Sequence, residues 1–187
     1  MFINEFTPMT SPTLRVIALT ALGGCALLLA GCSKKTVDET ANINKAPKIA
    51  VCTSAGLTAS LNGITGTAGT YYTTLTVTNT GTSSCVLKGK AKLALLNANA
   101  EELGNVSSPD TNMTLTPGEP IYASVAFPDA SNYADTNACK SGGVIVNFYA
   151  PGQSAPIQAY DTRTVKANWA VHACPGFALN AFSTVKP

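Results

Sequence analysis

The six cysteine thiols are the side chains of this chain best suited to covalent chemistry. A thiol can form a disulfide, bind a soft metal ion or accept another group on its sulfur. Two of them lie in an apolar N-terminal stretch and four are spread through the rest of the chain: Cys25 and Cys32, then Cys52, Cys85, Cys139 and Cys174. None of them forms a C-x-x-C pair and the chain has one histidine, so the spacing predicts no zinc site.

Cys32 directly follows the apolar stretch. Arg15 precedes the apolar residues Val16 to Leu28, and Leu29-Ala30-Gly31 leads into the cysteine. A basic flank, a short apolar core and small residues are the parts of a secretory signal, and a membrane span needs a longer core, of roughly 20 residues. The last four residues also resemble the bacterial lipobox, in which the cysteine thiol receives a diacylglycerol and becomes the new N-terminus after cleavage.

We therefore expect residues 1–31 to be a lipoprotein signal peptide and Cys32 to carry a diacylglyceryl group. Each buried methylene contributes about 0.8 kcal/mol, and the two acyl chains meet the two-chain requirement of stable anchoring. Residues 32–48 are polar and of mixed charge, as in a flexible tether. This predicts a protein held on the extracytoplasmic face of a cell membrane. In a cell with two membranes, both the inner and the outer membrane fit this prediction. The alternatives are an ordinary secretory signal and an uncleaved anchor.

The four remaining cysteines favour disulfides, because an even number of cysteines in an exported domain is typical of cross-linked folds. Four cysteines allow three connectivities. We favour Cys52–Cys85 and Cys139–Cys174, since the start of the first strand and the loop after the second lie at the same end of an up-and-down sandwich. The alternative is four free thiols.

The sequence of residues 49–187 predicts short strands with turns between them. Few residues are charged (12%) and threonine is abundant, which suits strands better than helices. Tyr71 to Thr78 alternates with a period of two, as in a half-buried strand. The segment Gly143 to Ala150 is the best candidate for a central strand. We predict an all-β domain, an antiparallel β-sandwich of about eight strands without a helix.

Several boundaries follow from the same pattern. We expect a turn at Asn62-Gly63, a single strand from Leu87 to Leu95, and loops over 106–112 and 128–139. Residues 157–171 are expected to form two strands with Trp169 packed inward, and Phe177 to Val185 to close the domain.

An ordered series of motifs matches a known family. Its parts are Cys52-Thr53, Ala68-Gly69-Thr70-Tyr71, Thr78-Asn79-Thr80-Gly81 with Cys85-Val86-Leu87-Lys88-Gly89, Leu115-Thr116-Pro117-Gly118, Cys139, Tyr149-Ala150-Pro151-Gly152 and Cys174. The series resembles an actinobacterial exported domain, common in lipoproteins, that is described only as domain of unknown function 4232. The resemblance implies an immunoglobulin-like sandwich with two disulfides on the cell surface, and it implies no catalytic residue and no ligand. The chain departs from the pattern at Lys90-Ala91 and in a longer insert over 158–170.

The residue types do not favour catalysis or nucleic-acid binding. A serine or threonine nucleophile usually needs a base, and the single histidine, His172, lies beside Cys174, where a structural role is expected. Glu101 and Glu102 are adjacent and would point to opposite faces of a strand. The net charge is only +2, and phosphate-binding loops and cofactor motifs are absent from the sequence. We expect a non-enzymatic protein without a cofactor and without a nucleic-acid partner.

Two features could serve binding. Lys88, Lys90 and Lys92 would form a row of positive charges on one face of the expected strand, able to meet an anionic polymer or headgroups; protection of a sheet edge is the alternative. Tyr133 lies in the polar loop before Cys139, and exposed loops on a rigid sandwich often carry recognition. We expect a module that binds another envelope component, protein or glycan; the alternative is a structural or accessory module of a membrane protein complex.

Overall fold

The computed structural model describes residues 48–161 and 171–187 of the chain. Every long element in these residues is a β-strand, and the helical turns are three-residue 3-10 turns. The first sheet has four strands in the order β13-β8-β3-β2, and all its pairings are antiparallel. Its strands are β2 (Leu57–Thr67), β3 (Thr70–Asn79), β8 (Pro120–Pro128) and β13 (Ala178–Leu179).

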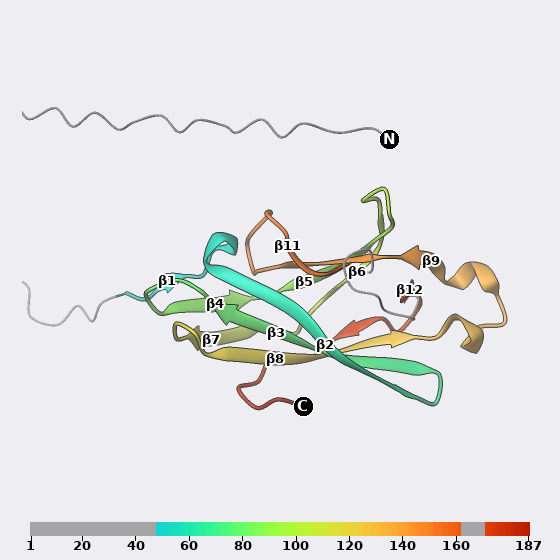
Figure 1. Cartoon of the computed structure of the whole chain (residues 1–187), viewed down its shortest axis with the longest axis horizontal. Coiled ribbons are helices and arrows are strands. Elements are labelled where there is room, and N and C mark those ends of the chain that lie inside the picture. Colours follow the sequence, from blue (N-terminus) through green and yellow to red (C-terminus); the bar gives the residue numbers. More distant parts are fainter. Residues whose placement is uncertain (1–47, 162–170) are drawn as a thin grey trace, which may run out of the picture. The chain divides into compact units, whose positions relative to one another are not determined.

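A second antiparallel sheet has the order β11-β10-β5-β6. Its strands are β5 (Lys92–Leu96), β6 (Glu102–Ser107), β10 (Ile145–Tyr149) and β11 (Ile157–Asp161). Figure 1 shows β11, β5 and β6 as one layer and β8, β3 and β2 as another. The strand expected to be central, β10, has a partner on each side, and this prediction is confirmed.

Two smaller sheets complete the described part of the chain. One has the order β1-β4-β7 and the other consists of β12 and β9. Their strands are β1 (Ala50–Val51), β4 (Cys85–Gly89), β7 (Thr111–Leu115), β9 (Lys140–Gly143) and β12 (Val171–Ala173). The pairing of β1 with β4 is parallel. The described residues thus confirm an all-β fold, with more and shorter strands than the sequence suggested.

The core lies between the two large sheets. Alternate residues of β3 and β8, such as Leu75 and Val125, face inward, and residues of β5 and β10, such as Leu93 and Phe148, belong to the same buried cluster. This alternation is the period of two expected for a half-buried strand. The residues between them on β3 face outward, so the fold fixes one apolar face and one hydroxyl-rich face of the first sheet.

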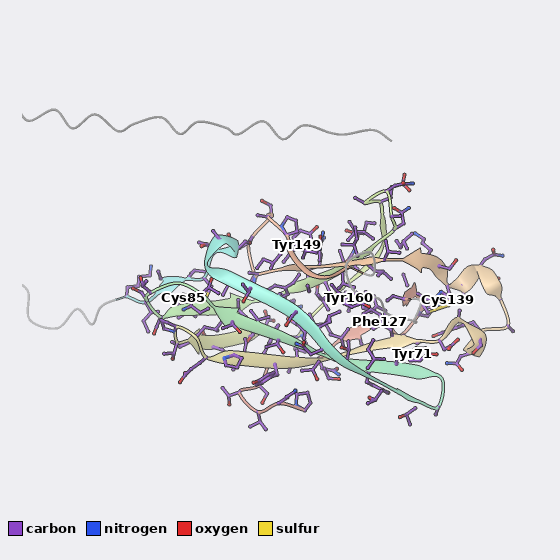
Figure 2. All side chains as sticks on the ribbon, in the orientation of Figure 1. Tyr71, Cys85, Phe127, Cys139, Tyr149 and Tyr160 are labelled. Atoms are coloured by element: carbon purple, nitrogen blue, oxygen red, sulfur yellow. A yellow bond between two sulfur atoms is a disulfide. The ribbon has the colours of Figure 1, made fainter. Side chains whose placement is uncertain are left out.

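Two disulfides cross-link the domain at opposite ends (Figure 2). Cys52 is bonded to Cys85, with the two Cα atoms 4.9 Å apart, and Cys139 is bonded to Cys174. The favoured connectivity is therefore confirmed. Cys52 directly follows β1 and its backbone N–H donates to the carbonyl of Val86 on β4, so the parallel pairing brings the two sulfurs together.

The prediction of a turn at Asn62-Gly63 is wrong. β2 continues through these residues with a register shift, and Gly63 has a φ of +67°, so the extra residue forms a bulge in the strand. The hairpin turn lies at Ala68-Gly69, where both residues have positive φ, of +47° and +76°. Positive φ at both central residues is the requirement of a tight two-residue hairpin turn.

The prediction of a single strand from Leu87 to Leu95 is also wrong, because this segment contains two strands. It is divided into β4 and β5, which belong to different sheets. Gly89 ends β4 with a φ of +108°, and a Cβ there would lie 3.3 Å from Pro151. The backbone N–H of Ala91 then donates to the hydroxyl of Ser108 instead of a sheet partner.

Three other expectations have mixed outcomes. The loop expected over 106–112 is shorter, because β6 extends to Ser107 and β7 begins at Thr111. β11 accounts for the first strand expected in 157–171, and β12 begins at Val171; Trp169 lies outside the described residues, as do Cys32 and residues 1–47. The C-terminal segment closes the first sheet through β13 and a bridge between Tyr122 and Ser183.

Candidate functional site

The three lysines expected in one row lie on different elements. Lys88 is exposed on β4, Lys90 is exposed in the connection after β4, and Lys92 is on β5. The division of the expected strand therefore removes the row that would have placed three positive charges on one strand face. In the described structure, the three lysines therefore share no strand face and no common partner.

Lys92 is already engaged with its neighbours. Its Nζ lies 3.5 Å from a carboxylate oxygen of Glu102 on β6 and 4.3 Å from the ring centroid of Tyr149 on β10. An ion pair together with a cation–π contact holds the ammonium group on the outer face of the second sheet. Lys92 thus cross-links three adjacent strands in the described structure.

The loop around Tyr133 is more ordered than a simple connector. It contains two 3-10 turns, Ala130–Asn132 and Thr136–Ala138, and each begins with an aspartate. The Asp129 carboxylate accepts from the backbone N–H of Ser131 at 2.8 Å, and the Asp135 carboxylate accepts from that of Asn137 at 2.9 Å. Side-chain acceptors at this position stabilise the start of a helical turn.

Tyr133 itself fastens this loop to the segment after β12. Its hydroxyl donates to the carbonyl of Pro175, next to the Cys139–Cys174 disulfide. The amide of Asn132 donates to the carbonyl of Gly69 in the β2–β3 hairpin turn. Both contacts are internal, so the described geometry gives Tyr133 a structural role at this end of the domain.

Tyr71 and Asp129 form an electrostatic pair at the same end. The hydrogen bond to Asp129, together with the negative charge of that carboxylate, raises the pKa of Tyr71 above its ordinary value. Hydrogen bonds from Ser131 and from Tyr71 lower the pKa of Asp129, and nearby His172 adds to the effect. The carboxylate therefore stays ionised at neutral pH and the phenol stays protonated, which suits a fixed hydrogen bond.

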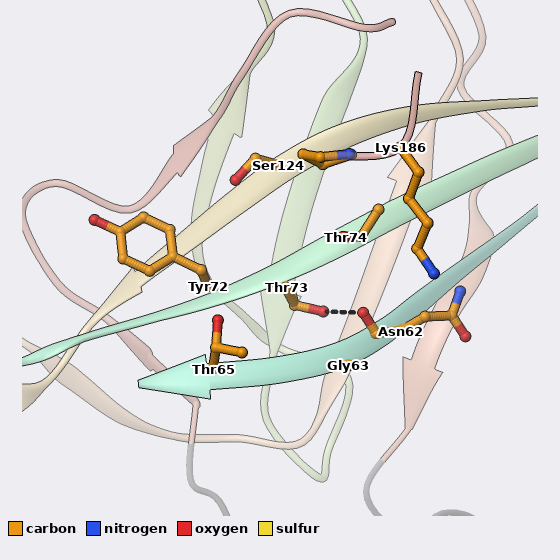
Figure 3. Close-up of a pocket in the computed structure, with 9 residues that line it drawn as sticks. Asn62, Gly63, Thr65, Tyr72, Thr73, Thr74, Ser124 and Lys186 are labelled. Atoms are coloured by element: carbon orange, nitrogen blue, oxygen red, sulfur yellow. Dashed lines mark hydrogen bonds between the residues drawn. The ribbon is translucent and has the colours of Figure 1, made fainter. Parts of the chain in front are cut away.

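A groove on the outer face of the first sheet was missed by the sequence analysis. It has a volume of about 310 Å³ and crosses β2, β3 and β8 (Figure 3). We call it the outer groove. Most of the residues that line it have a polar side chain, while carbon atoms form the larger part of its exposed surface. The lining residues are Asn62, Gly63, Thr65, Tyr72, Thr73, Thr74, Ser124, Lys186 and Pro187.

Strand pairing explains why these residues meet. Asn62 lies opposite Thr74, and Thr74 lies opposite Ser124, so three polar side chains from three strands form one row across the sheet. Thr65 lies opposite Tyr72 in a neighbouring row. Neighbouring strands are about 4.8 Å apart, so polar groups repeat at that spacing along each row.

Most of the side-chain hydroxyls that line the outer groove have no hydrogen-bond partner among the described residues. Five residues with hydroxyl groups line it, and Thr73 donates its hydroxyl to the carbonyl of Asn62 at 3.3 Å. Among residues 48–161 and 171–187, the other four hydroxyls make no hydrogen bond to a protein group: those of Thr65, Tyr72, Thr74 and Ser124. Asn62 donates to Ser60 at 2.8 Å and to Thr76 at 3.2 Å, which fixes its amide and leaves its side-chain oxygen free within the same residues.

The C-terminal segment forms one wall of the outer groove. Tyr122 and Ser183 exchange two backbone hydrogen bonds of 2.8 Å, and the N–H of Asn180 donates to the carbonyl of Ser124. These bonds fasten the segment along β8, and Lys186 then extends over the groove toward Asn62 (Figure 3). A second hollow of about 310 Å³ adjoins it between β8 and the same segment, so the surface depression continues past Ser124.

The described residues show no group of three or more His, Cys, Asp or Glu side chains able to hold a metal ion. In the same part of the chain, no helix is long and apolar enough to span a membrane. The side chains that line the outer groove supply hydroxyl, amide, aromatic and ammonium groups, and none of them is a carboxylate. These are groups that bind and orient a ligand.

Comparison with known sequences agrees with the motifs in the chain. The sequence model of one family, described as a domain of unknown function (DUF4232), matches residues 52–174. Neither the curated proteins nor the solved structures gave a significant match. The matched region starts and ends at a disulfide cysteine and covers most of the described domain, and the chain belongs to the DUF4232 family.

Proposed function

We propose that the chain is an extracytoplasmic lipoprotein that binds another component of the cell envelope and performs no catalysis. Cys32 carries the diacylglyceryl anchor, in line with the Leu-Ala-Gly-Cys sequence at the end of its apolar leader. The lipoprotein character also agrees with the resemblance to exported actinobacterial domains. The polar sequence of mixed charge over residues 32–48 agrees with a tether between this anchor and the domain.

The observation that carries the binding proposal is the outer groove. Its free hydroxyls and the Asn62 side-chain oxygen lie on rigid, paired strands, so a ligand meets donors and acceptors that are already in place. Polar groups held by a scaffold bind at a lower entropic cost than groups on mobile loops. Exposed Tyr72, with 42% of its surface accessible, adds a flat apolar face beside them.

The proposal is tested with insoluble envelope material prepared from the producing cells. The full-length protein, purified from membranes in detergent, is expected to sediment with this material. The double variant Thr74→Val with Ser124→Ala is expected to bind about thirtyfold more weakly, because each of the two lost hydrogen bonds contributes about 1 kcal/mol. The retained fraction is measured by quantitative blotting over a range of protein concentrations.

Thr78→Val is the matched control, because Thr78 faces outward on the same strand but does not line the groove. It should bind like the original protein. Absence of sedimentation, or equal binding by the groove variant, would contradict the proposal. Treatment of the envelope material with protease before the assay separates a protein partner, whose binding is lost, from a glycan partner, whose binding survives.

A further inference from the structure

We infer that the outer groove binds a glycan that carries an acidic group, a carboxylate or a phosphate. This inference rests on the proposed function and specifies the ligand of the same site. The first argument is charge. Lys186 has the one charged side chain among the residues that line the groove, and no carboxylate side chain of the described residues pairs with its ammonium group. A ligand that brings a negative charge satisfies this group, whereas a neutral ligand leaves it to solvent.

The second argument is the kind of polar group that surrounds Lys186. Thr74, Ser124 and Asn62 present hydroxyl and amide oxygens in one row across three strands. Hydroxyls both donate and accept hydrogen bonds, so such a row suits a ligand that itself consists of hydroxyl groups. The strand spacing of about 4.8 Å is comparable to the width of a sugar ring, so successive strands can contact one ring.

The third argument is the aromatic ring. Tyr72 is exposed at the edge of the groove opposite Thr65, and its hydroxyl has no protein partner among the described residues (Figure 3). An aromatic face buries apolar surface at a small cost in conformational entropy. The C–H face of a sugar supplies such surface, while its hydroxyls reach the polar row. A stable protein partner would instead require a larger contact surface than this groove offers, of about 800 Å² on each side.

The test uses a galacturonic acid hexamer and its fully methyl-esterified form, which has the same sugars without the charge. Both are titrated into the full-length protein in detergent, and dissociation constants are measured by calorimetry. The acid is expected to bind about fivefold more tightly than the ester, the upper range for one exposed ion pair. Lys186→Gln should remove this preference, so that acid and ester bind with equal affinity.

Two further variants complete the design. Tyr72→Ala should weaken binding of both ligands by about tenfold, whereas Lys88→Gln, which removes an exposed lysine outside the groove, should change neither. Equal affinity for acid and ester, or an unchanged preference in Lys186→Gln, would overturn the inference. Full displacement of the hexamer by an equal concentration of inorganic phosphate would also overturn it, because it would indicate a plain anion site.

The two proposals fail in different ways. If the protein sediments with envelope material through Thr74 and Ser124 but does not distinguish the acid from the ester, only the acidic-glycan inference is wrong. If groove variants leave sedimentation unchanged, the proposed function itself is wrong.

Discussion

Replacement of both Cys52 and Cys85 with serine is expected to lower the free energy of unfolding by about 3–4 kcal/mol. The bond closes a loop with a sequence separation of 33 residues, and loops of this size lose that much denatured-state entropy when they are cross-linked. The loss has a structural component as well. β1 consists of Ala50–Val51 and pairs with β4 alone among the described strands, and the disulfide reinforces this short pairing.

The measurement is urea unfolding of the oxidised protein and of the double serine variant. A double variant of Cys139 and Cys174 is the matched control, because that bond closes a loop of almost the same length, with a separation of 35 residues. The chain-entropy account predicts similar losses at both ends of the domain. A loss below about 1 kcal/mol for the Cys52–Cys85 pair would contradict this role.

The second large effect is expected for Asn79→Ala, at about 2–3 kcal/mol. Asn79 is 2% exposed and its amide makes three hydrogen bonds. Its Nδ2 donates to the carbonyls of Ser83 at 2.9 Å and Leu115 at 3.0 Å, and its Oδ1 accepts from the N–H of Gly81 at 2.9 Å. Alanine would leave these backbone groups without partners, which costs more than the loss of the bonds alone.

Asn62→Ala is the matched control for this prediction. Its amide also donates two hydrogen bonds, but Asn62 is exposed and water can replace the side chain. We therefore expect a loss of no more than about 0.5 kcal/mol for this exposed site. Equal destabilisation by the two substitutions, measured as the urea midpoint at an unchanged slope, would contradict the bridging role of Asn79.

Asn79 gives a physical reason for the most specific motif of the chain. The residues Thr-Asn-x-Gly at 78–81 place a buried amide where it joins the end of β3 to the following loop and to β7. Gly81 leaves room for this contact, since a Cβ there would lie 3.1 Å from the Asn79 side-chain oxygen. The motif is therefore explained by packing and hydrogen bonding in the fold, without any ligand.

The parts of the fold that could be predicted depend on local patterns. The alternation in Tyr71 to Thr78 specifies which side chains of β3 face the core, and the structure has Leu75 and Val77 fully buried there. The apolar run that contains Val146 and Phe148 likewise identifies the central strand β10. Such patterns hold because burial of one sheet face constrains every second residue.

The errors arise where a local pattern has two structural solutions. Asn-Gly is typical of a hairpin turn, but a glycine with positive φ also fits a bulge, and Gly63 takes that form. The turn instead uses Ala68, a residue that rarely adopts positive φ. Similarly, the alternating lysines from Lys88 to Lys92 predict one strand. In the structure, β4 ends at Gly89, and Lys90 and Ala91 connect it to β5 in another sheet.

The outer groove could not be predicted because distant segments form it. Its floor depends on the register of β2, β3 and β8, and its wall depends on the pairing of Ser183 with Tyr122. The outward positions of Tyr72 and Thr74 were visible as the polar face of the expected strand. The local sequence does not predict that Lys186 lies over that face.

The most direct test of the whole account is the intact mass of the mature protein from a membrane fraction. We predict a polypeptide that begins at Cys32, carries a diacylglyceryl group on that residue, and lacks two hydrogens for each of the two disulfides. A polypeptide that begins upstream of Cys32, or one recovered in buffer with an unmodified Cys32 thiol, would contradict the proposed membrane anchor and with it the envelope-binding function.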